Sequence, residues 1–446
     1  MRGSCGSLLF FMKPSPYLHC FPCPDRPGYR ILYSARKASL LLLEEELASR
    51  AAQGEELPPE ATTTLSRLGL VVADPEAERE AGRNLLADIN RENPSLNVAV
   101  ILTLACNFAC RYCYEGNLKE QPRPMIGETA ARLVEFLKER FAPGKKNLVL
   151  HFYGGEPLLA TERIKEIAAP LQQFAQQKGA NFGFSLVTNG SLLTPPIIEE
   201  LKPFGLRIAK ITLDGPADVH DRSRPFKSGE GSFETILGNV ADCCGLVGIG
   251  IQGNYTRENY QRFPELLDLL MERGVTPDKL LQVGFGPVLQ TRDQFTLADF
   301  HDGCCSANEP WLVEASIMLR EEILKRGYPA PKITPSPCMV DVDHAFTVHV
   351  DGGIYQCLSF IGHREYQTGD IWQGVRDYRE IYNLDHWRRH EECRDCSYLP
   401  LCFGGCRYME FQRHGAIKGV NCQKEYWDAA LGKLIQQSVR WMQKKS

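Results

Sequence analysis

The sequence has no long apolar run, no excess of charge of one sign and no internal repeat or low-complexity tract. No stretch approaches the roughly 18–20 apolar residues that cross a bilayer, so we expect no contact with a membrane. The formal net charge is −4 over 446 residues, which argues against nucleic acid as a partner, because proteins that bind it usually carry a basic excess. Near the start stands only the short patch SLLFF, too short for a signal-peptide core. We expect a cytoplasmic protein that starts at Met1 or at Met12.

Cysteine is the residue that the sequence has in excess, with 17 in the chain. Without an export signal, a chain of this length needs no disulfide staples, and clustered cysteines indicate metal ligands. One cluster is Cys106, Cys110 and Cys113; the other comprises Cys338, Cys357, Cys393, Cys396, Cys402, Cys406 and Cys422. For the remaining cysteines we favour buried small hydrophobic residues or surface thiols.

Residues 1–94 predict a small separate unit of winged-helix-like form. GYRILYS at 28–34 is an alternating strand candidate, and LVVADP at 70–75 is a second strand that closes on a proline. Apolar faces predict helices at 38–53 (ASLLLLEEELASRAAQ) and 59–69 (PEATTTLSRLG). A polar helix follows and joins this unit to the next.

Residues 95–290 alternate between strand and helix patterns six times. Short, continuous apolar runs predict strands of a parallel sheet buried on both faces, at 97–104, 147–153, 182–188, 207–214, 248–255 and 280–286. Helical patterns lie between them at 128–141, 161–177, 195–205, 231–244 and 257–274. Periodicity does not choose between a doubly wound sheet and a barrel, but both gather functional residues at the C-terminal ends of strands.

The rest of the chain divides into two parts. Residues 291–335 predict a helical bridge, and residues 336–446 hold short strands, the second cysteine cluster and an amphipathic helix at 426–445.

The first chemical motif is LACNFACRYCYEG, directly after the first strand of the predicted sheet. Its three cysteines have no fourth cysteine or histidine nearby, whereas a structural zinc wants four closed protein ligands. Three thiolates on one loop leave a metal site with one open coordination position. Iron–sulfur clusters are commonly held by such closely spaced thiolates.

Polar motifs follow the next strands as well. In HFYGGEP, glycines allow close backbone approach and Glu156 can pair with an ammonium group. VTNGSLL, ITLDGP and GNYT follow the third, fourth and fifth strands. In the HDRSRPF segment, Arg222 and Arg224 are equally well explained as contacts to a substrate carboxylate and as solvated loop charges.

In combination these motifs resemble the radical S-adenosylmethionine (SAM) enzymes over residues 97 to about 290. The resemblance implies a partial (β/α)6 TIM barrel within an α/β protein and a SAM-binding 4Fe–4S cluster on Cys106, Cys110 and Cys113, which are then the catalytic residues. It also implies a set of SAM contacts: Tyr112, Gly154, Gly155, Glu156, Thr188, Asn189, Thr212, Asp214, Gln252 and Asn254. Thr212 stands where relatives have serine.

The second cysteine cluster resembles the SPASM domain, which binds auxiliary iron–sulfur clusters. Its pattern is Cys338, then Gly352-x4-Cys357, then CRDCSYLPLCFGGC and a distant Cys422. The resemblance implies one auxiliary 4Fe–4S cluster on Cys393, Cys396, Cys402 and Cys422, and another on Cys338, Cys357 and Cys406. For the missing eighth ligand, the alternatives are an open iron site, which we favour, and His344.

SPASM-type relatives mostly modify peptides or proteins, and the layout looks closest to maturases of geopeptide-like ribosomal peptides. We therefore expect a peptide maturase that forms a thioether or another side-chain cross-link, with the precursor's leader bound by the N-terminal unit and electrons from a flavodoxin or ferredoxin. One alternative is an anaerobic sulfatase-type maturase, although Leu358 stands where those enzymes have an aspartate. Another is a zinc-rich, non-catalytic peptide-binding scaffold.

Overall fold

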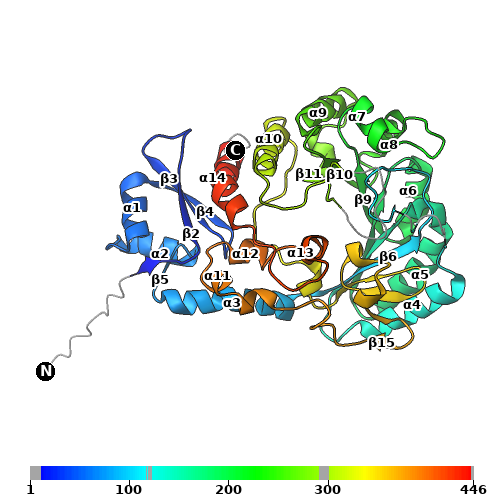
Figure 1. Ribbon diagram of the computed structural model, residues 1–446, viewed down its shortest axis with the longest axis horizontal. Coiled ribbons are helices and arrows are strands. Elements are labelled where there is room, and N and C mark those ends of the chain that lie inside the picture. Colours follow the sequence, from blue (N-terminus) through cyan, green and yellow to red (C-terminus); the bar gives the residue numbers. More distant parts are fainter. Residues whose placement is uncertain (1–11, 117, 119–122, 291–300, 443–446) are drawn as a thin grey trace.

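A computed structural model describes residues 12–116, 118, 123–290 and 301–442. The N-terminal unit lies at one end of the molecule and the large sheet with its helices at the other, and α14 lies between the N-terminal strands and α10 (Figure 1). None of the helices within the described ranges is long and apolar enough to span a membrane.

The N-terminal unit contains two small antiparallel sheets. One joins β1 (Lys13–Pro14) to β5 (Val71–Val72), and the other has the order β2-β3-β4, formed by Leu18–Pro22, Tyr29–Ser34 and Ser39–Glu44. The helices are α1 (Glu45–Gln53), α2 (Pro59–Arg67) and α3 (Pro75–Glu92).

The prediction of one helix over 38–53 is wrong for its first half, because residues 39–44 form strand β4. Leu41 pairs with Leu32 of β3, and the leucines of β4 alternate between two hydrophobic clusters. Leu41 and Leu43 pack with the α1 and α2 side chains, whereas Leu40 and Leu42 pack in the cluster that includes residues of α14. A run of four leucines fits a strand when both faces are covered.

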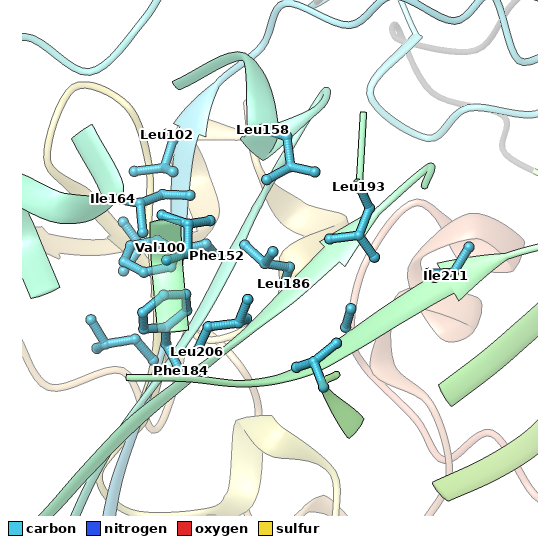
Figure 2. Close-up of a cluster of buried hydrophobic side chains, with 14 of the residues drawn as sticks. Val100, Leu102, Phe152, Leu158, Ile164, Phe184, Leu186, Leu193, Leu206 and Ile211 are labelled. Atoms are coloured by element: carbon cyan, nitrogen blue, oxygen red, sulfur yellow. The ribbon is translucent and has the colours of Figure 1, made fainter. Parts of the chain in front are cut away.

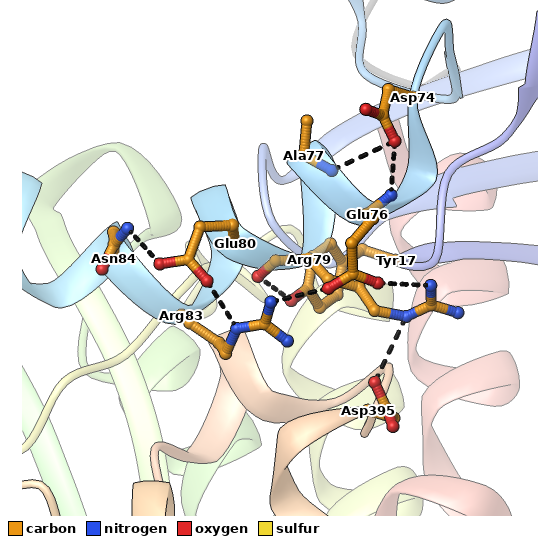
Figure 3. A network of polar contacts seen from close by, with 9 residues as sticks. All are labelled: Tyr17, Asp74, Glu76, Ala77, Arg79, Glu80, Arg83, Asn84 and Asp395. Atoms are coloured by element: carbon orange, nitrogen blue, oxygen red, sulfur yellow. Dashed lines mark hydrogen bonds and ion pairs between the residues drawn. The ribbon is translucent and has the colours of Figure 1, made fainter.

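Helix α3 links the N-terminal unit to the cysteine-rich C-terminal segment. Asp74 caps it by accepting from the backbone N–H of Glu76 and Ala77 at 2.9 and 3.3 Å, which satisfies two of the free N–H groups of its first turn. On its surface, Arg79 pairs with Glu76 at 3.3 Å and with Asp395 at 3.4 Å (Figure 3). Asp395 lies between Cys393 and Cys396, so this helix orients the segment that carries them.

The large sheet has ten strands in the order β11-β10-β9-β8-β7-β6-β12-β13-β14-β15. The six parallel strands from the edge strand β11 to β6 are the predicted ones: β6 (Ser95–Thr103), β7 (Asn147–Gly154), β8 (Asn181–Thr188), β9 (Leu206–Thr212), β10 (Gly248–Tyr255) and β11 (Leu280–Pro287). The helices between them are α4 (Gly127–Arg140), α5 (Thr161–Gln177), α6 (Pro195–Leu201), α7 (Ala217–Ser223), α8 (Phe233–Cys243) and α9 (Phe263–Glu272). The sequence patterns did not predict α7.

The core lies between these strands and their helices. Val100, Phe152, Phe184 and Ile211 are fully or almost fully buried, and Figure 2 shows them with leucines of the neighbouring strands and loops. They alternate along their strands with residues that face the other side, as the period of two requires. The helices therefore cover one face, and the strand ends are free to carry the motifs.

The C-terminal region continues this sheet rather than forming one of its own. Strand β12 (Ala345–Val348) pairs parallel with β6, and β13 (Gly353–Tyr355), β14 (Gln367–Asp370) and β15 (Gly374–Val375) follow antiparallel. The helices are α10 (Pro310–Lys325), α11 (Glu391–Arg394), α12 (Leu399–Cys402), α13 (Arg407–His414) and α14 (Lys424–Met442). Of the predicted bridge, 310–325 is helical, and 291–300 lies outside the described residues.

Short 3-10 turns complete the described secondary structure. They are η2 (Pro157–Ala160), η3 (Lys202–Phe204), η4 (Tyr260–Arg262), η5 (Pro277–Lys279), η6 (Met339–Asp341), η7 (Leu358–Phe360), η8 (Arg364–Tyr366) and η9 (His386–Arg389).

Candidate active site at the strand ends

The C-terminal ends of β6–β10 surround a cavity of about 340 Å³. Because neighbouring parallel strands end at the same edge of a sheet, motifs far apart in the sequence meet there. Of the predicted site residues, the cavity is lined by Cys106, Cys110, Cys113, Tyr112, Gly154, Gly155, Thr188, Asn189, Thr212 and Asn254. Three of the predicted SAM contacts, Glu156, Asp214 and Gln252, are not among the residues that line it.

The cysteine loop is fixed by the segment that follows α7. The backbone N–H groups of Ala109 and Arg111 donate to the carbonyls of Pro225 and Ser223 at 2.9 and 3.0 Å. The rings of Phe108 and Phe226 meet edge to face, with centroids 4.9 Å apart. The loop that carries the three thiols is therefore held by backbone hydrogen bonds and by this ring contact.

The two glycines of GGEP let β7 approach this same loop. The N–H of Gly155 donates to Thr103 O and that of Glu156 to Ala105 O, both at 2.9 Å. A Cβ atom on Gly154 would overlap Thr103 O, and one on Gly155 would overlap Ala105 O. Gly154 also has φ +134°, which favours glycine. The glycines thus serve close contact between backbone segments, and they also border the cavity.

Glu156 positions the neighbouring motif. Its fully buried carboxylate accepts from Thr188 Oγ1 at 2.7 Å, from the Asn189 N–H at 2.8 Å and from the Leu158 N–H at 3.0 Å. Burial raises the pKa of Glu156, and the three donors oppose that shift. The protein's own donors therefore occupy the carboxylate that the sequence suggested for an ammonium group.

Asp214 has a similar positioning role next to the third cysteine. Its carboxylate accepts from the Tyr112 hydroxyl and from the Asn254 N–H, the latter at 2.8 Å. The Tyr112 oxygen also accepts from Arg224 Nη1 at 2.9 Å and Asn254 Nδ2 at 3.0 Å. Burial raises the pKa of Asp214, whereas the Arg224 charge lowers it. This network locks the aromatic residue before Cys113.

His220 extends the network away from the cavity. Its Nδ1 accepts from the Asp214 N–H at 3.0 Å, so the neutral ring carries its proton on Nε2, 3.1 Å from Ser232 Oγ. Ser232 Oγ in turn donates to Arg224 O at 2.7 Å. Burial and the Arg224 charge hold the pKa of His220 well below its ordinary value. Its neutrality is needed here, because a second ring proton would meet the Asp214 N–H.

The seven C-terminal cysteines fall into two spatial groups. Burial raises the pKa of Cys357 to about 12, and the neighbouring Cys338 and Cys406 add to the shift. Burial likewise raises the pKa of Cys402 to about 12, with Cys396, Cys393 and Cys422 as its charged neighbours. Within each set, the thiols therefore act electrostatically on one another, and their assignment as ligands of two clusters stays a prediction. His344 lies elsewhere: Lys145, Arg140 and Asp343 are the charges that act on it.

The C-terminal region also closes the cavity of the first cysteines. Ser359 and Tyr408 line it from this side. Ser359 donates hydrogen bonds toward Cys357, and Tyr408 is two residues from Cys406. Residues next to the C-terminal cysteines therefore contribute to the cavity that the first three cysteines line.

The donor chemistry fits iron–sulfur clusters. Among the described residues, no three His, Cys, Asp or Glu side chains are grouped so that they could hold a metal ion. In a 4Fe–4S cluster each thiolate binds a different iron, so its ligands need not converge on one point. Soft thiolates around a protein cavity suit such a cluster, and the open side of the first cavity has room for a further ligand.

Fold and site together define an α/β enzyme that works at the ends of its parallel strands, next to three thiols. Residues 100–276 match the Radical SAM superfamily, so this part of the chain is a radical SAM domain, and named relatives of the chain are enzymes. This family uses a 4Fe–4S cluster together with SAM.

Named relatives cover most of the chain. A PqqA peptide cyclase of Granulibacter bethesdensis is 24% identical over 341 residues, 72% of this chain and 85% of its own. A cysteine-type anaerobic sulfatase-maturating enzyme of Clostridium novyi is 22% identical over 365 residues, 74% of this chain and 93% of its own.

Solved structures share the fold. The chain is similar to native anSMEcpe with bound AdoMet and Cp18Cys peptide, with a TM-score of 0.61 and 20% identity over 78% of this chain and 99% of that one. It is also similar to Streptococcus suis SuiB bound to precursor peptide SuiA, with a TM-score of 0.52 and 15% identity over 92% of this chain and 99% of that one.

Sequence reasoning missed the residues that act through others. Arg224 is only 8% exposed, lines the cavity and donates to Tyr112, so it is not a solvated loop charge. Ser232, Ser359 and Tyr408 carried no motif. A signal was available for His220, because it is the first residue of the HDRSRPF segment that follows ITLDGP.

Proposed function

We propose that this enzyme matures a ribosomally made precursor peptide in the cytoplasm, forming a thioether or another side-chain cross-link. The observation that carries the proposal is the shared cavity: Cys106, Cys110 and Cys113 lie on one side, and Ser359 and Tyr408 of the C-terminal cysteine region lie on the other. A peptide side chain held between them is within reach of both cysteine clusters.

The first three cysteines would hold the SAM-binding 4Fe–4S cluster. When bound, this cluster and SAM supply a 5′-deoxyadenosyl radical that takes a hydrogen atom from the substrate. Gly154, Gly155, Thr188, Asn189, Thr212 and Asn254 border the same cavity and are our SAM contacts, with Tyr112 fixed beside them. Glu156 and Asp214 position these residues, and enclosure by the two regions excludes water.

The other seven cysteines would hold two auxiliary 4Fe–4S clusters, one on Cys393, Cys396, Cys402 and Cys422 and one on Cys338, Cys357 and Cys406. The position of His344 beside Lys145 and Arg140 favours an open iron site in the second cluster. Electrons enter from an external donor, a flavodoxin or ferredoxin.

The N-terminal unit would bind the leader of the precursor. Strand β4 is an outer strand of its sheet and pairs with β3 but, among the described residues, with no other strand. Both of its faces are covered, and its free edge presents unpaired N–H and C=O groups that an extended peptide can match. The names of SuiB with its precursor peptide and of PqqA peptide cyclase agree with this class of substrate.

An anaerobic sulfatase-type maturase is the second candidate, favoured by the likeness to anSMEcpe and to the Clostridium novyi enzyme. Leu358 after Cys357 disfavours it, because a leucine cannot serve as a base. Ser359, which does reach the cavity, is a poor base without a partner.

The test begins with the first cluster. Anaerobically reconstituted enzyme should be brown, contain about twelve irons per chain and cleave SAM with dithionite. Replacing Cys106, Cys110 and Cys113 by alanine should abolish cleavage, whereas Cys244→Ala, which does not line this cavity, should not. A colourless, zinc-loaded protein without SAM cleavage would instead indicate the non-catalytic scaffold.

The product decides between the two enzyme candidates. Coexpression with a short Cys-containing peptide encoded next to the enzyme should give a product lighter by about two hydrogens, located by tandem mass spectrometry. Formation of formylglycine on a sulfatase-derived peptide, with no change in the short peptide, would contradict the cross-linking proposal.

A further inference from the structure

A second, larger cleft of about 940 Å³ lies between the sheet and the C-terminal helices. Its floor is formed by β9, β10 and β11, and its other walls by α10, α14 and the segment around Cys338 and Cys406. Asn254 lines both this cleft and the cavity of the first cysteines. Asn254, at the end of β10, therefore lies between the two spaces.

The floor consists of the side chains that face away from the helices. On β9, Ile208 and Lys210 point to the cleft, while Ala209 and Ile211 are buried in the core. On β10 the exposed Gln252 also lines the cleft. Gln252 therefore belongs to the cleft and not to the SAM cavity.

Glycines leave open space above the floor of the cleft, although at two of these positions the neighbouring atoms would leave room for a side chain. A Cβ atom on Gly286 would meet nothing within 4 Å, and one on Gly250 would meet only Gln282 O at 3.8 Å. Neither has a positive φ angle. By contrast, Gly253 between them could not carry a side chain, since its Cβ would overlap Leu213 O. The space above Gly250 and Gly286 is thus available to a bound chain.

The charged side chains of the cleft are all cations, although three cysteines that would hold auxiliary clusters, Cys338, Cys402 and Cys406, also line it. Its lining side chains include Lys210, Arg320 and Lys332 and, among the described residues, no carboxylate. None of these three cations forms an ion pair with a described residue. Arg320 donates to neutral acceptors, Leu434 O and Ser438 Oγ, both at 3.0 Å, and its buried Nε has no partner. Unpaired cations in a partly enclosed cleft attract anions strongly, because water screens them poorly.

We propose that this cleft binds an extended, acidic segment of the peptide substrate. Lys210, Arg320 and Lys332 receive its Asp or Glu carboxylates, and the amides of Gln252 and Gln282 meet its backbone. The low floor at Gly250 and Gly286 admits the backbone itself, and Asn254 marks the passage to the reacting residue. This inference rests on the proposed function and adds the chemical class of the substrate.

The three cations come from three places around the cleft. Lys210 lies on β9 of the floor, Arg320 on α10, and Lys332 on the segment that follows α10. The full charges that act on Cys338, one of the cysteines of this cleft, are instead those of Arg407 and Asp341.

The test uses fluorescein-labelled peptides of equal length with the repeats Gly-Glu, Gly-Gln and Gly-Lys, added to the reconstituted full chain near physiological salt. Fluorescence anisotropy should show the Gly-Glu peptide binding about tenfold more tightly than the Gly-Gln peptide. Lys210→Glu with Lys332→Glu should reverse the order in favour of Gly-Lys. Lys433→Glu, exposed on α14 outside the cleft, should leave the order unchanged.

A second variant tests shape independently of charge. Gly286→Leu should weaken the Gly-Glu and Gly-Gln peptides alike by about tenfold, whereas Gly238→Leu, on the outer helix α8 with open space around it, should not. Equal binding of the Gly-Glu and Gly-Gln peptides, or equal effects of the Lys433 and Lys210/Lys332 changes, would overturn the inference. If the Lys210→Glu variant does not fold, Lys332→Glu alone, at an exposed residue, should still reduce the preference for the Gly-Glu peptide over the Gly-Gln peptide. SAM cleavage by the same wild-type preparation reports on the proposed function separately.

Discussion

At the scale of the residue, the buried ring of His151 makes the free energy of unfolding depend on pH. Its Nδ1 lies 2.7 Å from Ser185 Oγ, and burial, with Lys210 nearby, lowers its pKa from 6.5 to about 4. As the pH falls, the unfolded chain takes up the proton first. The stabilisation is thus complete above pH 6.5 and is lost between 6.5 and about 4. We expect a loss of roughly 3 kcal/mol over that window.

His151→Gln, which keeps a hydrogen-bonding group beside Ser185, should flatten this dependence. Anaerobic urea unfolding at about pH 7 and about pH 5 measures it for both proteins. An unchanged slope in the variant would show that the imidazole is not the group responsible.

At the scale of the element, α3 is interlocked with the N-terminal strands through a glycine. A Cβ atom on Gly82 would overlap the Tyr17 ring, whose hydroxyl donates to Arg79 O at 3.3 Å. Alanine usually stabilises a helix by about 1 kcal/mol relative to glycine, but overpacking costs about 1–3 kcal/mol. The Tyr17 ring is 2% exposed and has little room to move. The cost of overpacking should therefore exceed the gain in helix propensity, and Gly82→Ala should lower the free energy of unfolding.

Gly238→Ala in α8 is the matched control, because its new Cβ meets open space. It should raise stability slightly, by up to about 1 kcal/mol. Thermal or urea denaturation of both variants gives the comparison, and two shifts of the same sign would contradict the packing argument.

At the scale of the whole molecule, the sheet crosses the expected boundary at residues 335–336. Strand β12 covers the edge of β6, a nine-residue strand that is almost wholly buried. A chain ending at Pro335 would expose that long apolar edge, which is a template for aggregation. We expect it to be insoluble or aggregated by size-exclusion chromatography, whereas the full chain is not. A soluble, monomeric and folded fragment would show that the C-terminal strands are dispensable.

The sequence predicted the parts whose signal is local. The six parallel strands and most of their helices agree with the structure to within a few residues, because continuous apolar runs and helical periodicity mark them. The error at residues 39–44 has the opposite cause: four leucines in a row suit a helix or a strand, and only α14 and the α1–α2 cluster on its two faces decide. The site motifs were predictable as strand-end segments, but Glu156 and Asp214 point into the protein, which no spacing reveals.

Two levels of organisation thus determine this enzyme. By itself the sequence determined the three-cysteine loop, the order of the strand-end motifs and the cysteine spacings, since these depend on residues close together in the chain. The tertiary structure alone decided that Ser359 and Tyr408 close the first cavity, and that three cations without carboxylate partners line the adjoining cleft. Both depend on β12 pairing with β6 and on α14 packing against α10, contacts between residues more than 100 positions apart, for which the local sequence carries no signal.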